Sequence, residues 1–375
     1  GGVLDIKKKW LEVLASLRQS KLKRAGDDPI YAFPWYLVIG EPGAGKSALL
    51  KASAPLSSIG PSSAEGGTRN VDWWFFDNAV LLDTAGGYVF QEKEGEVAAE
   101  WQTLLTLLKT NRGREPINGV VVAVPADSLI SKPIEKLKEQ AAQLRERLDD
   151  LVQQLGVKFP VYLAVTKSDR IAGFTEFFQL LPDQVKGQAL GFANQEMTSA
   201  AEASRLFDRG FRMIYERLER VRLSVLGDCD AENVPRGLFL FPGEVKSLQV
   251  PLKAFVDVLF RPSPYHDAPF FRGLFLTSAR QGSTPLSRLS YLLGQNYTHP
   301  TPTTPSREVF LRDFGSVILP ADRALIGQTA TGRERYGLTR AAGAVIAMAA
   351  SLLACGVLTL SFSNNWFALK ALDVL

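Results

Sequence analysis

The chain has 375 residues, of which 46% are hydrophobic and 22% charged, values typical of a globular protein with one large or two ordinary domains. Its formal charge of +4 is concentrated in residues 1–24, which hold seven basic and two acidic side chains. The nearly neutral remainder argues against a nucleic-acid-binding face. Two cysteines without metal-ligand spacing exclude a disulfide framework and indicate a reducing compartment.

The hydrophobic pattern predicts an α/β fold with a mostly parallel sheet. An amphipathic basic helix is expected over 4–24; it suits either solvent or an anionic membrane surface. Its apolar side is expected to hold Leu4, Trp10, Leu11, Leu14 and Leu17. A buried strand over 34–40 opens into a glycine-rich loop, and the helix after that loop ends near Pro55.

A loop over 57–70 and an antiparallel hairpin over 71–83 come next. We expect further helices over 93–110, 131–155, most of 174–226, and 246–260. Further buried strands are predicted over 117–125, 159–165, 237–243 and 270–278.

The segment 341–362 contains no charged residue. As a helix it would span about 33 Å at ~1.5 Å per residue, enough to cross a hydrocarbon core of ~30 Å. A buried core helix is the alternative. Arg333, Arg335 and Arg340 precede the segment, so the positive-inside tendency predicts a cytoplasmic body and a C-terminus on the other side.

Residues 40–47, Gly-Glu-Pro-Gly-Ala-Gly-Lys-Ser, match the phosphate-binding pattern G-x-x-x-x-G-K-[ST]. Glycines let the backbone turn so that successive N–H groups and the next helix N-terminus face a phosphate. Lys46 is expected to reach the β- and γ-phosphates, and Ser47 to bind Mg²⁺. The predicted phosphate-binding residues are Gly40, Gly43, Ala44, Gly45, Lys46, Ser47 and Ala48. A purely structural glycine turn is the alternative.

The D-T-A-G sequence at 83–86 ends the second strand of the hairpin. A carboxylate at Asp83 can hold Mg²⁺ through water, and the Gly86 N–H can face the γ-phosphate. Thr68, in the preceding loop, is a candidate to complete the Mg²⁺ shell. The candidate catalytic residues are therefore Lys46, Asp83 and Gly86, and the candidate metal ligands are Ser47, Thr68 and Asp83.

Thr166-Lys167-Ser168-Asp169 follows a buried strand and matches the T-K-x-D guanine-specificity pattern. The Asp169 carboxylate would accept hydrogen bonds from guanine N1–H and N2–H₂, while the Lys167 stem lies along the base. Adenine offers no such pair of donors, so the site should discriminate against ATP. The predicted cofactors are GTP or GDP with Mg²⁺; a charged loop tip without a ligand is the alternative.

Five segments, GEPGAGKS, WWFFDNAVLLDTAGGY, TKSD, FFRGLFLTSARQG and VFLRDFGSVI, together with the apolar segment, resemble the TssM/IcmF family of inner-membrane proteins of the bacterial type VI secretion system. The resemblance implies a P-loop GTPase-like cytoplasmic region between the second and third membrane spans. It also implies TssL-like, TssJ-like and baseplate partners and self-association in a trans-envelope complex.

The resulting assignment divides the chain into five parts. These are a basic juxtamembrane helix (1–27), a P-loop GTPase-like domain (28–260) with a helical insertion at about 174–230, a cytoplasmic extension (261–337), a transmembrane helix (338–363) and the start of a periplasmic region (364–375). Two further spans would precede residue 1.

The sequence departs from efficient GTPases after D-T-A-G. Where those enzymes have a glutamine that orients the attacking water, this chain has Gly87, followed by Tyr88. Gln91 and Arg69 are the nearby candidates to supply the missing group. We therefore expect slow intrinsic hydrolysis unless a partner provides that group.

A second departure concerns the last guanine-contacting loop, expected after the strand at 238–241. Pro242-Gly243-Glu244 stands there in place of S-A-K, and Ser278–Arg280 is expected to lie too far along the chain to serve. The sequence leaves three hypotheses: a GTP-dependent switch, a nucleotide-independent docking scaffold, and an ATPase.

Overall fold

The chain divides into two compact units, residues 1–327 and 328–375. The computed structural model describes residues 2–19, 28–53, 57–59, 68–90, 95–181, 188–194, 202–228, 234–262, 269–279, 284–293, 318–328 and 348–362.

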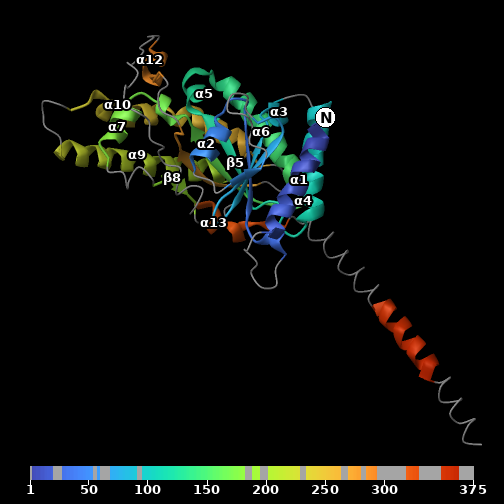
Figure 1. Cartoon of the computed structure of the whole chain (residues 1–375). Helices are drawn as coiled ribbons and strands as arrows, with labels where there is room; N and C mark the ends of the chain where they lie inside the picture. Colours follow the sequence, from blue (N-terminus) through green and yellow to red (C-terminus); the bar gives the residue numbers. More distant parts are fainter. Residues whose placement is uncertain are drawn as a thin grey trace, which may run out of the picture. The chain divides into compact units, whose positions relative to one another are not determined.

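A mixed sheet organises the first unit (Figure 1), and its eight described strands run in the order β2-β3-β4-β1-β5-β7-β9-β8. Neighbours pair in parallel through the centre of the sheet: β4 (Val80–Thr84), β1 (Trp35–Gly40), β5 (Gly119–Pro125), β7 (Pro160–Thr166) and β9 (Phe270–Leu276). Antiparallel pairs close the two edges: β2 (Ser57–Ile59) with β3 (Val71–Phe75), β3 with β4, and β8 (Leu190–Ala193) with β9. The predicted mostly parallel sheet with its hairpin is confirmed.

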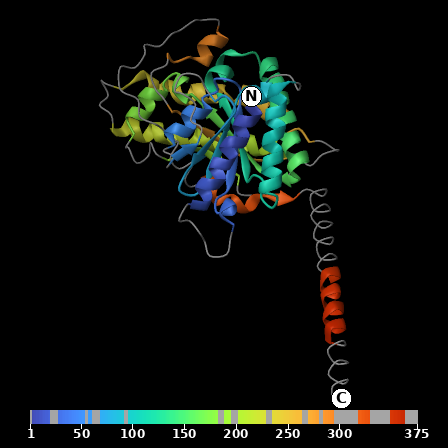
Figure 2. The same cartoon turned by 45° about the vertical axis from the view of Figure 1, so that its right-hand side comes forward.

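Helices cover both faces of this sheet because its central strands are apolar on both sides. Leu37 and Ile39 of β1 point into the larger core, under α1 (Gly2–Gln19), α4 (Glu96–Asn111) and α6 (Ile134–Leu155). Tyr36 and Val38 point into a smaller core with Leu50 of α2 (Lys46–Ala52) and Leu319 of α13 (Leu319–Ala321). Helices α1 and α4 run side by side over the larger core (Figure 2).

The chain between β7 and β9 forms a mainly helical insertion. It contains α7 (Phe174–Gln179), β8, α9 (Ala203–Asp228), α10 (Arg236–Ser247) and α11 (Gln249–Leu259). The other short elements are α3 (Gly87–Phe90), α5 (Ala126–Ser131), α12 (Arg288–Leu292), β6 (Val157–Lys158), β10 (Gly327–Gln328) and three 3₁₀ turns, η1 (Pro29–Tyr31), η2 (Ser168–Arg170) and η5 (Arg323–Leu325).

Several sequence-based expectations are wrong in detail. The predicted strand at 237–243 lies inside α10, where buried residues recur at helical spacing: Leu238, Phe241 and Val245. Two short strands occur where a loop and a helix were expected, β2 and β8. The strand β9, which lies in the predicted extension after residue 260, pairs with β7 inside the main sheet.

The buried side of α1 also differs from the expected one. Ile6, Trp10, Val13 and Leu17 are buried, whereas Leu4 and Leu11 are 70% and 67% exposed. The buried residues follow a spacing of three to four, the period of one face of a straight helix.

Among the residues that the structure describes, no helix is both long enough and apolar enough to cross a membrane. Within the predicted span, residues 348–362 are helical, and 338–347 and 363 lie outside the described residues. The membrane span stays a prediction.

Candidate functional site

The phosphate loop connects the carboxyl end of β1 to the N-terminus of α2, as its motif requires. Gly43 and Gly45 have φ angles of 73° and 81°, left-handed values that glycine adopts without strain. Lys46 is buried, and its Nζ donates to the main-chain oxygens of Gly40 and Glu41 at 3.0 and 3.1 Å. Burial lowers the pKa of Lys46, while the charges of Asp83 and Glu41 raise it.

The three candidate Mg²⁺ ligands meet at one point although they come from three separate segments. Asp83 Oδ2 accepts from Ser47 Oγ at 2.5 Å and from Thr68 Oγ1 at 2.6 Å. The two hydroxyl oxygens lie 3.0 Å apart. Asp83 is fully buried, and burial raises its pKa against the hydrogen bonds from Ser47 and Thr68 and the charge of Lys46, which lower it.

The other carboxylate oxygen of Asp83, Oδ1, is buried and has no hydrogen-bond partner among the described residues. A buried carboxylate oxygen without a partner is costly. Hydroxyl and carboxylate oxygens are also the ligands that Mg²⁺ prefers. The donor set therefore fits a divalent cation, either directly or through its water shell.

The D-T-A-G segment lies directly against the phosphate loop. A Cβ added at Gly86 would stand 2.4 Å from the backbone nitrogen of Pro42, so no other residue fits this position without moving the loop. Thr84 Oγ1 also donates to the carbonyl of Val38 in β1 at 2.8 Å.

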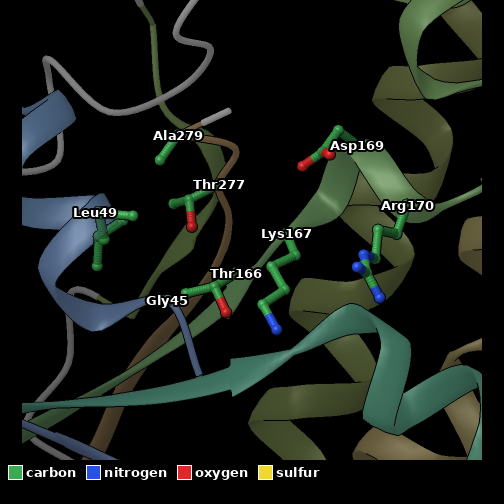
Figure 3. Close-up of a pocket in the computed structure, with 9 residues that line it drawn as sticks. Gly45, Leu49, Thr166, Lys167, Asp169, Arg170, Thr277 and Ala279 are labelled. Carbon is green, nitrogen blue, oxygen red and sulfur yellow. The ribbon is translucent and has the colours of Figure 1, made fainter. Parts of the chain in front are cut away.

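The predicted base-recognition residues and two phosphate-loop residues line one pocket beyond the loop (Figure 3). Its lining comprises Gly45, Ala48, Leu49, Thr166, Lys167, Asp169, Arg170, Thr277 and Ala279. Its volume is about 180 Å³, below the ~300–1,000 Å³ of pockets that enclose a whole ligand. The pocket therefore suits one part of a nucleotide, such as its base.

Short contacts fix the geometry of this pocket. Thr166 Oγ1 donates to the carbonyl of Ala44 at 2.5 Å, which joins the end of β7 to the phosphate loop. Lys167 has a φ of 53°. The Asp169 carboxylate is buried, points toward Thr277 and Ala279 (Figure 3), and accepts from Ser278 Oγ at 2.8 Å. Burial raises the pKa of Asp169, and the hydrogen bond from Ser278 opposes that rise.

Comparison with known proteins adds the family. Residues 94–347 match the IcmF-related N-terminal domain, a range that covers more than half of the chain. The chain belongs to the IcmF-related family. The predicted membership of the TssM/IcmF family is thereby confirmed.

Two relatives share sequence with this IcmF-related chain. The type VI secretion system component TssM1 of Pseudomonas aeruginosa is 35% identical over 385 aligned residues, which cover 98% of this chain and 35% of TssM1. The probable GTP-binding protein EngB of Bdellovibrio bacteriovorus is 22% identical over 146 residues, 39% of this chain and 66% of that protein. The chain thus spans about a third of the length of TssM1.

Among solved structures, the signal recognition particle receptor SRb-GTP/SRX complex from Chaetomium thermophilum overlaps 38% of this chain and 75% of its own. The sequences are 20% identical and the TM-score is 0.25, so this overlap does not bear on function.

This IcmF-related chain has a glycine, Gly87, at the position where efficient GTPases have the glutamine that orients the attacking water. Gly87 begins the short helix α3, and the next side chain, Tyr88, is buried and donates from its hydroxyl to Glu100 Oε2 at 3.0 Å. Arg69 is exposed beside Thr68, and Gln91 lies outside the described residues. Neither Gly87 nor Tyr88 thus offers a side chain to an attacking water.

Ser278 is the site residue that sequence reasoning misplaced. It lies two residues after the end of β9. The N–H of Thr277, between them, donates to the carbonyl of Val165 in β7 at 2.8 Å. The expectation that Ser278 lies too far along the chain is therefore wrong, because the insertion returns the chain to the sheet beside β7. Arg280 lies outside the described residues. The signal was present as an S-A pair after an apolar run.

Glu244, which we had expected in a guanine-contacting loop, instead holds α12 in place. Its carboxylate accepts from the Ser287 hydroxyl, from the Arg288 N–H at 2.8 Å and from the Leu289 N–H at 3.3 Å. It is buried, so the segment Pro242–Glu244 belongs to the core of the insertion.

Asn70 connects the candidate site to the N-terminal helix. Its carbonyl accepts from the Ala85 N–H at 2.8 Å, within D-T-A-G. Its side chain donates to Asp5 Oδ2 of α1 at 3.0 Å. Asn70 also stands two residues after Thr68, so this one residue, through its side chain and its backbone carbonyl, links α1 with two of the candidate nucleotide loops.

Proposed function

We propose that this region binds GTP or GDP with Mg²⁺ and hydrolyses GTP slowly, as part of an inner-membrane component of a type VI secretion system. The observation that carries the proposal is the convergence of Ser47, Thr68 and Asp83 beside the phosphate loop. The adjoining pocket adds Asp169, which Ser278 holds by a hydrogen bond. The name of the EngB relative, a probable GTP-binding protein, supports the same reading.

Each residue would have a distinct task in that reaction. The N–H groups of the loop and the Lys46 ammonium would bind the phosphates, and Lys46 would leave the two carbonyls it now contacts. Ser47, Thr68 and Asp83 would hold Mg²⁺, which neutralises charge that develops on the phosphates. The Gly86 N–H would bind the γ-phosphate. Asp169, held by Ser278, would accept from guanine.

Slow hydrolysis follows from the segment after D-T-A-G. Gly87 has no side chain to orient water, and the Tyr88 hydroxyl is bound to Glu100 in the core. A partner that inserts an arginine or a glutamine would then accelerate the reaction. The second candidate function, a docking scaffold that works without nucleotide, is favoured by the same two residues.

Calorimetric titration of the full chain with non-hydrolysable GTP and ATP analogues and Mg²⁺ tests these alternatives. The GTP-dependent switch is supported if the GTP analogue binds more tightly than the ATP analogue and Lys46→Ala abolishes that binding. Binding of neither nucleotide would leave the scaffold, and preferential ATP binding would indicate an ATPase.

The base assignment has its own test. Asp169→Asn should lower GTP affinity about 100-fold, since each hydrogen bond from a charged partner is worth ~1.5–3 kcal/mol, and should favour a xanthosine triphosphate analogue. Unchanged GTP affinity would show that Asp169 does not contact the base.

The membrane arrangement also belongs to this proposal. Residues 1–337 would be cytoplasmic, 338–363 would cross the inner membrane, and TssL-like, TssJ-like and baseplate proteins would join the chain in a self-associating complex. The relative named as a type VI secretion system component, TssM1, supports this placement. In membrane vesicles with the cytoplasmic face outward, added protease should digest residues 1–337; full protection would contradict the orientation.

A further inference from the structure

The phosphate loop contains an acidic residue whose side chain is fully engaged outside the loop. Glu41, the second residue of the motif, has an 18% exposed side chain. Its Oε1 accepts from Ser128 Oγ at 2.7 Å, and its Oε2 accepts from Lys132 Nζ at 2.8 Å and Gln140 Nε2 at 2.7 Å. We call Ser128, Lys132 and Gln140 the α5–α6 clamp, because all three belong to that segment.

A carboxylate at this place is electrostatically unfavourable for an anion site. The main-chain oxygen of Glu41 accepts from Lys46 Nζ, and the charge of Glu41 acts on the pKa of Lys46. An unheld carboxylate would therefore compete with phosphate for the same ammonium and would repel the phosphates themselves. The clamp directs this charge toward α5–α6 and offsets it with the Lys132 cation.

We propose that Glu41 and Lys132 form a positioning pair that fixes the entry of the phosphate loop and keeps the Glu41 carboxylate away from Lys46 and the bound phosphates. Neither residue is catalytic in this scheme. The inference rests on the proposed nucleotide-binding function, and it adds a role for α5 and the start of α6 that the phosphate-binding motif does not contain.

A double-mutant cycle distinguishes this role from a merely structural tie between loop and helix. The full chain is titrated with a non-hydrolysable GTP analogue and Mg²⁺. Lys132→Met should weaken binding about tenfold, because it leaves the Glu41 carboxylate near the phosphates without a compensating cation and with only two neutral hydrogen-bond donors to hold it. Glu41→Gln, which keeps the side-chain oxygen but removes the charge, should bind as well as the unmodified protein or better.

The double variant Glu41→Gln/Lys132→Met decides the matter. Restored affinity supports the positioning pair, since no carboxylate is left to release. Affinity as low as in Lys132→Met alone, or no loss in Lys132→Met, would overturn it. Lys136→Met is the matched control, because Lys136 pairs with Glu139 on the exposed side of α6 and should leave affinity unchanged.

Hydrogen exchange without nucleotide separates this inference from the proposed function. Lys132→Met should speed amide exchange in residues 40–47, and the double variant should not restore full protection, because the contact itself is missing. Suppose that no protein binds nucleotide but Lys132→Met exchanges its loop amides faster than the unmodified protein. The proposed function then fails, and the clamp is only a structural contact between the loop and α5–α6. If Lys132→Met does not change the rate of amide exchange in residues 40–47, the proposed role of the clamp is wrong.

Discussion

Asp83 is a buried carboxylate at the candidate site, and its burial has an electrostatic cost. It is fully buried, its Oδ2 accepts two hydroxyl hydrogen bonds, and its Oδ1 has no partner among the described residues. Burial raises its pKa above the ordinary value of 3.8, because the charged form loses more solvation than the three favourable contacts return. The site is thus electrostatically strained without a cation, and a bound cation would relieve that strain.

This strain predicts a pH dependence of stability in nucleotide-free protein. Between pH 3.8 and the raised folded-state pKa, the folded protein binds more protons at Asp83 than the unfolded chain. The contribution of Asp83 to the free energy of unfolding therefore falls as the pH rises through this window, and its cost is complete above it. Asp83→Asn should remove this dependence and be more stable than the unmodified protein at neutral pH.

Urea denaturation of both proteins from pH 4 to pH 7.5, without Mg²⁺ or nucleotide, checks the prediction. The difference in unfolding free energy between variant and unmodified protein should grow with pH. A difference that does not change with pH would mean that the pKa of Asp83 is not raised.

At the scale of elements, the packing of α1 decides how firmly the hairpin is held. Trp10 of α1 is buried, and its ring centroid lies 5.6 Å from that of Trp35 in β1 and 6.1 Å from that of Trp73 in β3. Lys9 Nζ adds an ion pair at 3.0 Å to the buried Asp72 of β3. The helix is therefore part of the core and does not lie loosely beside it.

Trp10→Ala should lower the free energy of unfolding by about 3–5 kcal/mol, the usual cost of removing a large aromatic side chain from a core. The matched control, Leu11→Ala, alters the exposed side of the same helix and should change stability by less than about 0.5 kcal/mol. Chemical denaturation measures both. Equal, small effects would indicate that α1 is not anchored through Trp10.

The elements also show how far the sequence could predict this fold. The helix at 131–155 was predictable because its apolar residues recur at helical spacing on one face. The central strands were predictable because burial on both faces leaves a continuous apolar run. The run at 237–243 was not predictable, since all seven of its residues are apolar or small and fit a strand and a helix equally. The helical period of its buried residues appears only when Val245 is included. Likewise, the motifs located Lys46, Asp83 and Asp169, but nothing local to Ser278 indicated that the strand before it pairs with β7 and so brings Ser278 to Asp169.

At the scale of the first unit, the segment 318–327 packs against the end of the sheet opposite the pocket. Asp322 is buried and accepts from Arg272 Nε and Nη2 at 2.6 and 2.7 Å and from the Tyr162 hydroxyl at 2.5 Å. Arg272 and Tyr162 belong to β9 and β7, so one carboxylate joins two strands to a segment about fifty residues farther along. The spacing of these three residues along the chain does not predict this contact.

Asp322→Asn should destabilise the protein by about 3 kcal/mol, because it leaves the mostly buried Arg272 cation without its partner. It should also speed proteolysis after Arg323. Asp150→Asn, which breaks a more exposed pair with Arg147, should cost less than about 1 kcal/mol. Thermal unfolding and limited trypsin digestion report both effects; an unchanged rate of cleavage at Arg323 would show that Asp322 does not hold this segment.

Through Asn70, the attachment of α1 is coupled in free energy to the ordering of the two loops at the candidate site. A partner that pulls α1 away must break the bond between Asp5 and Asn70, and Asn70 also holds Ala85 and adjoins Thr68. The work needed to detach the eighteen residues of α1 would then depend on whether these two loops are ordered. By linkage, a ligand that orders the loops would strengthen the attachment of α1 by the same factor by which α1 strengthens the ligand. Tension applied to α1 would thus lower the affinity of the phosphate site for such a ligand.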